Sequence, residues 1–197
     1  MHPRHLRAVA ALLFAVTAFA DDPGPRDCFQ VFDPANLNVG DSVFNITNTG
    51  TENTAAGAPD NICANVYAFS PDEQLISCCS CPVTPNGLVS FSSQDLLNNA
   101  LTLSRPTSIV VKLLATKGIA CNAANAPDAS LATGMKAWGT KLHPLPTTPV
   151  AFAITETKFA SATLDDGELF RITTLCSFIQ ANGSGFGICK PCRVGGQ

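Results

Sequence analysis

Short runs in which apolar and polar residues alternate recur along the chain. Ser42 to Asn48, Ile62 to Phe69, Met135 to Leu142 and Val150 to Phe159 all follow this pattern. Successive side chains of a β-strand point to opposite faces, so a period of two predicts a strand in each segment. Ser108 to Thr116 is continuously apolar apart from Lys112, which predicts a strand buried on both faces.

A strong turn signal separates two further apolar runs. Thr84-Pro85-Asn86-Gly87 lies between Gln74–Val83 and Leu88–Ser92. Asn-Gly tolerates the positive φ angles of tight turns, so the two runs are predicted to form the arms of a hairpin. A short helical turn is predicted at Gln94–Asn99.

One stretch near the C-terminus has a helical period. Thr163 or Asp165 can cap its first turn, and Asn182-Gly183 ends it, which predicts a helix over residues 165–181. The apolar positions that carry this period are Leu164, Leu169, Ile172, Leu175, Phe178 and Ile179. Short strands followed by one helix predict a mainly β, antiparallel, sandwich-like domain with a C-terminal helix.

The first twenty residues have the pattern of a secretory signal. A short basic region precedes the apolar run Ala8–Phe19, and small residues stand at the expected cleavage point after Ala20. The apolar run is shorter than the roughly 20 residues that a membrane-spanning helix needs. The sequence therefore predicts a secreted or periplasmic protein without a membrane span. The expected organisation is a signal peptide (1–20), a flexible segment (21–41), one β-rich domain (42–192) and a tail (193–197).

Nine cysteines follow the signal segment. Exported proteins meet an oxidising compartment, so disulfides are expected rather than free thiols. Because nine is odd, one thiol stays outside an intramolecular bridge, and Cys28 in the N-terminal segment is the candidate. The disulfide candidates are Cys63, Cys78, Cys79, Cys81, Cys121, Cys176, Cys189 and Cys192.

The cluster Cys78-Cys79-Ser80-Cys81 sends its thiols in two directions. On a strand, Cys79 and Cys81 face one way and Cys78 the other. Cys176, Cys189 and Cys192 are expected to pair partly with this cluster, which would tie the helix to the sheet, although the sequence does not determine the connectivity. A thiolate metal site is the alternative; zinc sites use paired C-x2-4-C units, and Cys189-x-x-Cys192 has that form. A redox role for that unit would need a helix after it, and the chain is too short there.

Two segments resemble a family of secreted bacterial proteins of unknown function. The first is Asn61 to Gly87, with its C-C-x-C-P-V-T-P motif, and the second is Cys176 to Cys189, with C-S-F-I-Q-x-N-G-S-G-F-G-x-C. The resemblance covers roughly residues 40 to 192. It implies export and a common fold, and it implies no activity and no catalytic residues.

Charge narrows the range of partners. The formal net charge is −3, and cleavage after Ala20 would remove Arg4 and Arg7 and make the chain more acidic. A mildly acidic chain without a basic cluster argues against nucleic acid and anionic membranes as partners. Contact with a protein or a surface glycan stays open.

Candidate catalytic residues are sparse. His143 is the one histidine after the signal segment, and no G-x-S-x-G elbow accompanies it. Glu156 and Asp165 could serve as the carboxylates of a hydrolase, whereas Asp166 and Glu168 are explained by the start of a helix. The favoured hypothesis is a secreted, non-catalytic structural or binding module without metal or cofactor. A carboxylate hydrolase is the alternative, and a cysteine-thiolate metal protein is a further one.

Overall fold

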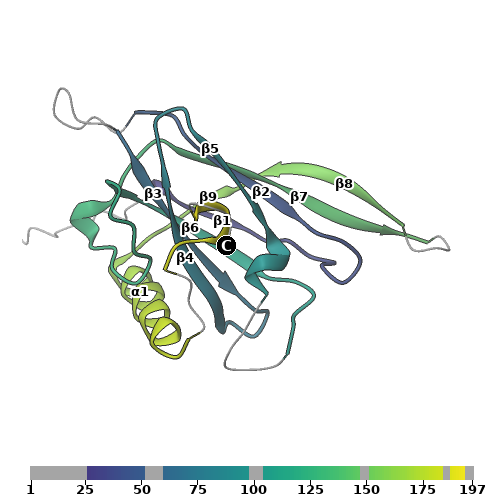
Figure 1. Ribbon diagram of the computed structural model, residues 1–197. Coiled ribbons are helices and arrows are strands. Elements are labelled where there is room, and N and C mark those ends of the chain that lie inside the picture. Colours follow the sequence, from purple (N-terminus) through teal and green to yellow (C-terminus); the bar gives the residue numbers. More distant parts are fainter. Residues whose placement is uncertain (1–25, 52–59, 98–103, 147–150, 184–186, 194–197) are drawn as a thin grey trace, which may run out of the picture.

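Two antiparallel β-sheets and one helix make up the fold. The structure is a computed structural model that describes residues 26–51, 60–97, 104–146, 151–183 and 187–193. The strands are β1 (Arg26–Phe32), β2 (Val43–Asn48), β3 (Ile62–Phe69), β4 (Leu75–Val83), β5 (Leu88–Ser92), β6 (Val110–Lys117), β7 (Met135–Leu145), β8 (Ala151–Lys158) and β9 (Ala160–Ala162). The larger sheet has the order β4-β3-β6-β1-β9 and the smaller one β5-β2-β7-β8, as Figure 1 shows. This arrangement confirms the predicted β-sandwich-like class.

Phenylalanine rings fill the space between the sheets. Phe44 on β2 stacks on Phe91 of β5, and Phe32 on β1 stacks on Phe159, each pair with ring centroids 4.8 Å apart. Phe44 and Phe159 also meet, at 5.8 Å. A Cβ atom on Gly139 of β7 would lie 2.7 Å from the Phe32 ring, so only glycine lets β7 approach this closely. The aromatic cluster therefore connects both sheets through one contact network.

The centre of the larger sheet is buried on both faces. All eight residues of β3 are buried, and β3 pairs with both β4 and β6. β6 confirms the strand predicted from the apolar run at 108–116. A strand can be apolar on both faces only when each face is covered, here by the smaller sheet on one side and on the other by a helix and by the loop that contains Cys121 and Ala123.

The helix α1 (Asp166–Ala181) lies against β4 and the outer face of the larger sheet. Asp165 caps its first turn, because the Asp165 carboxylate accepts the backbone N–H of Glu168 at 2.7 Å. Gly183 follows its end with a φ of 80°, which fits the predicted stop at Asn182-Gly183. Glu168 forms an ion pair with Lys112 of β6, which fastens the first turn of the helix to the sheet.

Four disulfides hold these parts together. The structure pairs Cys63 with Cys121, Cys78 with Cys176, Cys79 with Cys189 and Cys81 with Cys192. Three bridges therefore join the Cys78–Cys81 cluster to the C-terminal part of the chain, as expected. Cys78 reaches α1 on the outer face, whereas Cys79 and Cys81 reach the segment that follows it. Disulfides persist in oxidising compartments, so the four bridges indicate an extracellular environment.

The segment after α1 also covers the edge of the larger sheet. The Ser80 N–H donates to the Gly187 carbonyl at 3.2 Å, and the Cys189 N–H donates to the Ser80 carbonyl at 3.1 Å. Beyond them, the short turn η3 (Lys190–Cys192) lies against β5. The N–H and C=O groups on the open edge of β4 are thus partly hydrogen-bonded by residues 187–189. Disulfides tie Cys79 of β4 to Cys189 in this segment and Cys81 to Cys192 just after it.

The predicted hairpin across Thr84–Gly87 is wrong. The turn itself forms, with the Gly87 N–H bonded to the Thr84 carbonyl at 2.8 Å and Asn86 at a φ of 58°. The two strands then separate, because β4 pairs with β3 in the larger sheet and β5 pairs with β2 in the smaller one. The turn therefore links the two layers rather than two neighbours in one sheet.

The N-terminal segment also differs from the expectation of a flexible region at 21–41. Residues 26–32 form β1, which lies between β6 and β9 in the larger sheet. Cys28 and Phe29 are buried there, and Cys28 is in none of the four disulfides. The domain thus begins before residue 42. The predicted signal (1–20) lies outside the described residues, as does the predicted tail beyond Arg193.

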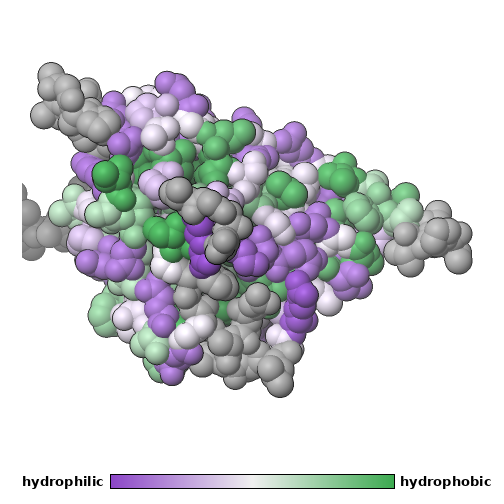
Figure 2. All heavy atoms as spheres, viewed as in Figure 1, coloured by the Kyte–Doolittle hydropathy of each residue, from purple (hydrophilic) through white to green (hydrophobic). Residues whose placement is uncertain are grey.

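The β7–β8 pair extends from the sandwich as an arm (Figure 1). All eight residues of β8 are exposed, and β8 is the last strand of its sheet. Hydrophobic residues lie along this arm, among them Phe152 and Ile154 (Figure 2). Among the described residues, no helix is long and apolar enough to cross a membrane.

Candidate functional site

The residues considered for catalysis do not converge. Glu156 is exposed on β8, and Asp165 serves as the cap of α1. His143 is exposed on β7, where its Nε2 atom bonds to the Thr155 hydroxyl at 2.8 Å. Within the described part of the chain, no hydrogen bond or ion pair joins any two of these three side chains. A hydrolytic pair of carboxylates would need two such groups facing one substrate.

Glu168 belongs to a structural ion-pair network. Partial burial alone would raise the pKa of Glu168, but hydrogen bonds from Lys112 and Arg171 outweigh it and hold the pKa below its ordinary value. Arg171 also lies over the Phe69 ring, 5.0 Å from the centroid. This carboxylate therefore anchors the helix to the sheet.

Eight of the nine cysteines form disulfides. Cys189 and Cys192 bind Cys79 and Cys81, so the C-x-x-C unit forms no bridge of its own. A sulfur atom in a disulfide is not the thiolate that a metal site requires. Among the described residues, no group of three or more His, Cys, Asp or Glu side chains could hold a metal ion.

A groove of about 590 Å³ opens where the chain passes from the smaller sheet to the larger one. This volume lies within the range of about 300–1,000 Å³ that is usual for small-molecule sites. The groove runs from the start of β7 to β1 and β9. Its lining residues are Asp27, Gln30, Thr47, Thr49, Thr51, Gly134, Met135, Lys136, Ala137, Trp138, Lys158, Phe159 and Ser161.

Gln30 is the buried polar side chain of this groove, with only 6% of its surface exposed. Its Nε2 atom donates to the carbonyl oxygens of Asp27 at 3.0 Å and Met135 at 2.8 Å. Both amide hydrogens are thus used, and the amide plane is held between β1 and β7. The Oε1 atom accepts no hydrogen bond from any residue in the described ranges. Among the described residues, the buried side-chain polar atoms without a partner are the hydroxyl oxygens of Ser77 and Ser93, so the Gln30 Oε1 atom is reached by solvent and can accept a hydrogen bond from a ligand.

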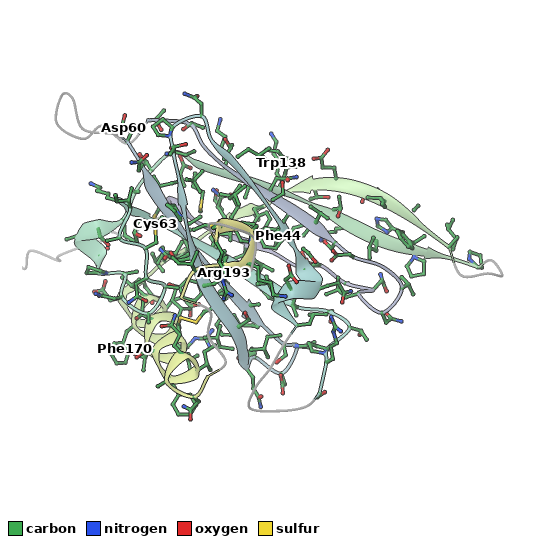
Figure 3. The ribbon with its side chains drawn as sticks, in the orientation of Figure 1. Phe44, Asp60, Cys63, Trp138, Phe170 and Arg193 are labelled. Carbon is green, nitrogen blue, oxygen red and sulfur yellow. A yellow bond between two sulfur atoms is a disulfide. The ribbon has the colours of Figure 1, made fainter. Side chains whose placement is uncertain are left out.

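Trp138 and two lysines line the side of the groove formed by the smaller sheet. Trp138 on β7 is half-buried and lies directly opposite Lys158 of β8 in the sheet register. Lys136 stands two residues before Trp138 and therefore points to the same face. Figure 3 places Trp138 far from Phe170 of α1. Neither lysine forms an ion pair with a residue that the structure describes.

Threonine hydroxyls line the end of the groove beside Gly134. The Thr47 hydroxyl donates to the Gly87 carbonyl at 2.8 Å, and the Thr49 hydroxyl donates to the Gly134 carbonyl at 2.9 Å. Thr49 and Thr51 share a further hydrogen bond of 3.0 Å. Gly134 has a φ of 84°, and a Cβ atom there would lie 2.5 Å from the Thr51 hydroxyl oxygen. Glycine therefore lets the threonines approach the start of β7 this closely.

No family model, curated protein or solved structure matches this chain. The groove must therefore be interpreted from its own chemistry. It combines an aromatic wall, the amide oxygen of Gln30, several hydroxyls, two lysines and the Asp27 carboxylate. Such a mixture can bind and orient a polar ligand.

Sequence reasoning missed this groove. Its side chains come from β1, β2, β7, β8 and β9 and from the connections between them, so no local motif marks it. The sole tryptophan of the chain was the one signal available, since Trp is large, amphipathic and enriched at binding surfaces. Gln30 lay inside the segment expected to be flexible.

Proposed function

We propose that the protein is an exported, non-catalytic binding module that holds a small polar ligand in the groove between β1, β7 and β9. The Gln30 amide oxygen carries this proposal. Two hydrogen bonds from the Nε2 atom of the same amide fix its position, and no residue in the described ranges donates a hydrogen bond to it. Pockets that bind ligands combine apolar walls with a few oriented polar groups, which describes this groove.

Export is supported by two independent features. The four disulfides fit an oxidising compartment, and residues 1–20 have the pattern of a cleaved signal. The resemblance to secreted bacterial proteins agrees with both. Mass spectrometry of the exported protein should find an N-terminus near Asp21 and four disulfides. A chain that keeps its first twenty residues would contradict export by this route.

The absence of turnover is part of the proposal. Asp27 is the one carboxylate among the described residues that line the groove. General acid–base hydrolysis of glycosides uses two carboxylates on either side of the bond. The groove can therefore hold a ligand without the pair of groups that would cleave it.

Trp138 provides a direct test, because it is the only tryptophan in the chain and it lines the groove. Monosaccharides, amino acids and nucleosides would be titrated at millimolar concentration into the purified protein while its tryptophan emission is recorded. We expect one class to change the emission and to be recovered chemically unchanged. Turnover of the bound compound, or no response to any class, would overturn the proposal.

Two variants locate the response. Gln30→Met keeps the length of the side chain and removes the amide, so it should weaken binding of the active compound. Phe152→Ala removes an exposed aromatic ring of β8 outside the groove and should leave binding unchanged. If Gln30→Met folds poorly, Trp138→Ala, with calorimetry as the readout, serves as the groove variant. Equal binding by Trp138→Ala and the original protein would place the ligand elsewhere and refute the assignment.

A further inference from the structure

We infer that the groove takes a saccharide unit that carries a carboxylate group. This inference rests on the binding function proposed above and specifies its ligand. It follows from three properties of the lining: which hydrogen bonds remain unused, where the aromatic ring lies, and how the charges are distributed.

At the end formed by Asp27, Gln30 and the threonines, the polar lining of the groove accepts hydrogen bonds more than it donates them. Thr47 and Thr49 have committed their hydroxyl hydrogens to the Gly87 and Gly134 carbonyls, and Thr51 can only donate to Thr49 in the bond that they share. Gln30 has committed both amide hydrogens, which leaves Oε1 as an acceptor. Threonine oxygens, the Gln30 oxygen and the Asp27 carboxylate therefore all offer lone pairs. A complementary ligand must be rich in donors.

The two lysine ammonium groups outnumber the single Asp27 carboxylate in the lining, so the net charge of the groove disfavours a cationic source of those donors. Lys136 and Lys158 lie on the same sheet face as Trp138, and neither is neutralised by a described residue. A ligand ammonium group would meet two like charges, which lowers affinity. Hydroxyl groups supply donors without positive charge. The same two ammonium groups favour a negative substituent, and a carboxylate is the simplest one on a hydroxyl-rich ligand.

The apolar part of the lining fits a sugar ring. The half-buried indole of Trp138 is the aromatic surface on the outer face of β7, and Met135, Ala137 and Phe159 add apolar lining elsewhere in the groove. Pyranose rings expose a face of C–H groups that packs on an aromatic surface, while their hydroxyls point outward to polar groups. Amphipathic aromatic side chains suit such a ligand because one part of the contact is apolar and the other is hydrated. A linear hydroxy acid would use the lysines but not the ring.

A pair of matched probes tests the ligand class. Trigalacturonic acid carries carboxylates, and galactotriose has the same type of ring without them. Each would be titrated into the full-length exported protein, with tryptophan emission and calorimetry as readouts. We expect the acidic trimer to bind at least about tenfold more tightly than the neutral one, and its affinity to fall as salt rises.

Variants separate the contributions of charge and ring. Lys136→Ala and Lys158→Ala should each weaken the acidic trimer severalfold and leave the neutral trimer unchanged. Trp138→Ala, followed by calorimetry, should weaken both trimers. Lys117→Ala, at the end of β6 and outside the groove, is the matched control and should change neither. Circular dichroism would show that each variant keeps the fold.

The outcomes distinguish this inference from the function on which it rests. Equal affinity for both trimers would refute the acidic substituent. Binding of an amino acid or nucleoside, with no response to either trimer, would refute the saccharide class and keep the binding function. No change of tryptophan emission with any compound would overturn both.

Discussion

The hydroxyl of Tyr67 donates a hydrogen bond to the carbonyl oxygen of Ala123 over 2.7 Å, beneath the loop that Cys121 ties to β3. Tyr67 is fully buried, and burial raises the pKa of its hydroxyl, so the group remains a neutral donor. The bond and the Cys63–Cys121 disulfide hold the same loop from two points. The loop is thus fixed to the outer face of the larger sheet.

Tyr67→Phe should therefore destabilise the protein. The change leaves the buried Ala123 carbonyl without its donor, at a cost of roughly 1–3 kcal/mol in the free energy of unfolding. Urea unfolding followed by circular dichroism measures the effect. An unchanged unfolding midpoint and slope would show that the hydroxyl contributes nothing at this position.

Gly139→Ala should destabilise the aromatic core. The added Cβ atom would lie 2.7 Å from the Phe32 ring and 3.1 Å from the Phe44 Cβ atom, and the Phe32 ring is held by its stack on Phe159. Overpacking of this kind costs about 1–3 kcal/mol. Gly187→Ala is the matched control, because nothing lies within 4 Å of its added atom. Thermal unfolding of both variants compares them, and equal melting temperatures would contradict the prediction.

Removal of the bridge that holds α1 should have a larger effect. The double variant Cys78→Ala with Cys176→Ala opens a loop closed over a separation of 98 residues. We expect a loss of about 2–5 kcal/mol in the free energy of unfolding. Mass spectrometry must first show that the other three bridges are intact. A variant as stable as the original protein would mean that packing alone holds the helix.

Acid should weaken the attachment of α1 to the sheet. The pKa of Glu168 lies below its ordinary value of 4.5, so the ionised carboxylate stabilises the fold above that pH. This contribution is lost as the pH falls through the lower folded-state pKa. Glu168→Gln should be less stable than the original protein by roughly 1–3 kcal/mol at neutral pH, and the difference should shrink below pH 4.5.

Urea unfolding at a series of pH values checks this prediction. Glu156→Gln, which changes an exposed carboxylate of β8, is the control and should stay parallel to the original protein. A constant difference between Glu168→Gln and the original protein at all pH values would show that Glu168 acts through packing rather than charge.

Local periodicity was sufficient for most elements. The alternation at 42–48 and 62–69 and the helical spacing over 165–181 correspond to β2, β3 and α1 nearly residue for residue. These patterns are local because each reflects which face of one element is buried. The cap at Asp165 is equally local, since it depends on a side chain and an N–H three residues later.

Choice of partner strand was not predictable in the same way. The turn at Thr84–Gly87 forms as its sequence indicates, yet β4 and β5 enter different sheets. The residue types of a turn determine the backbone conformation of four positions, whereas the choice of partner strand depends on which faces are buried by residues distant in the sequence. β1 was missed because the proline, glycine and aspartate residues that flank its seven residues are typical of loops rather than of strands. The groove was missed because its residues meet only after the sheets have packed.

The disulfide connectivity has a consequence for synthesis. Cys78, Cys79 and Cys81 leave the ribosome together, and their native partners follow 98, 110 and 111 positions later. Until then each of the three can react only with a wrong sulfur, including its immediate neighbours. Thiol–disulfide exchange can correct such early pairs, but only once the last partners have arrived. The native pairing thus needs an oxidant that acts after the last cysteines have arrived, or an isomerase that exchanges the non-native disulfides formed by an earlier oxidant.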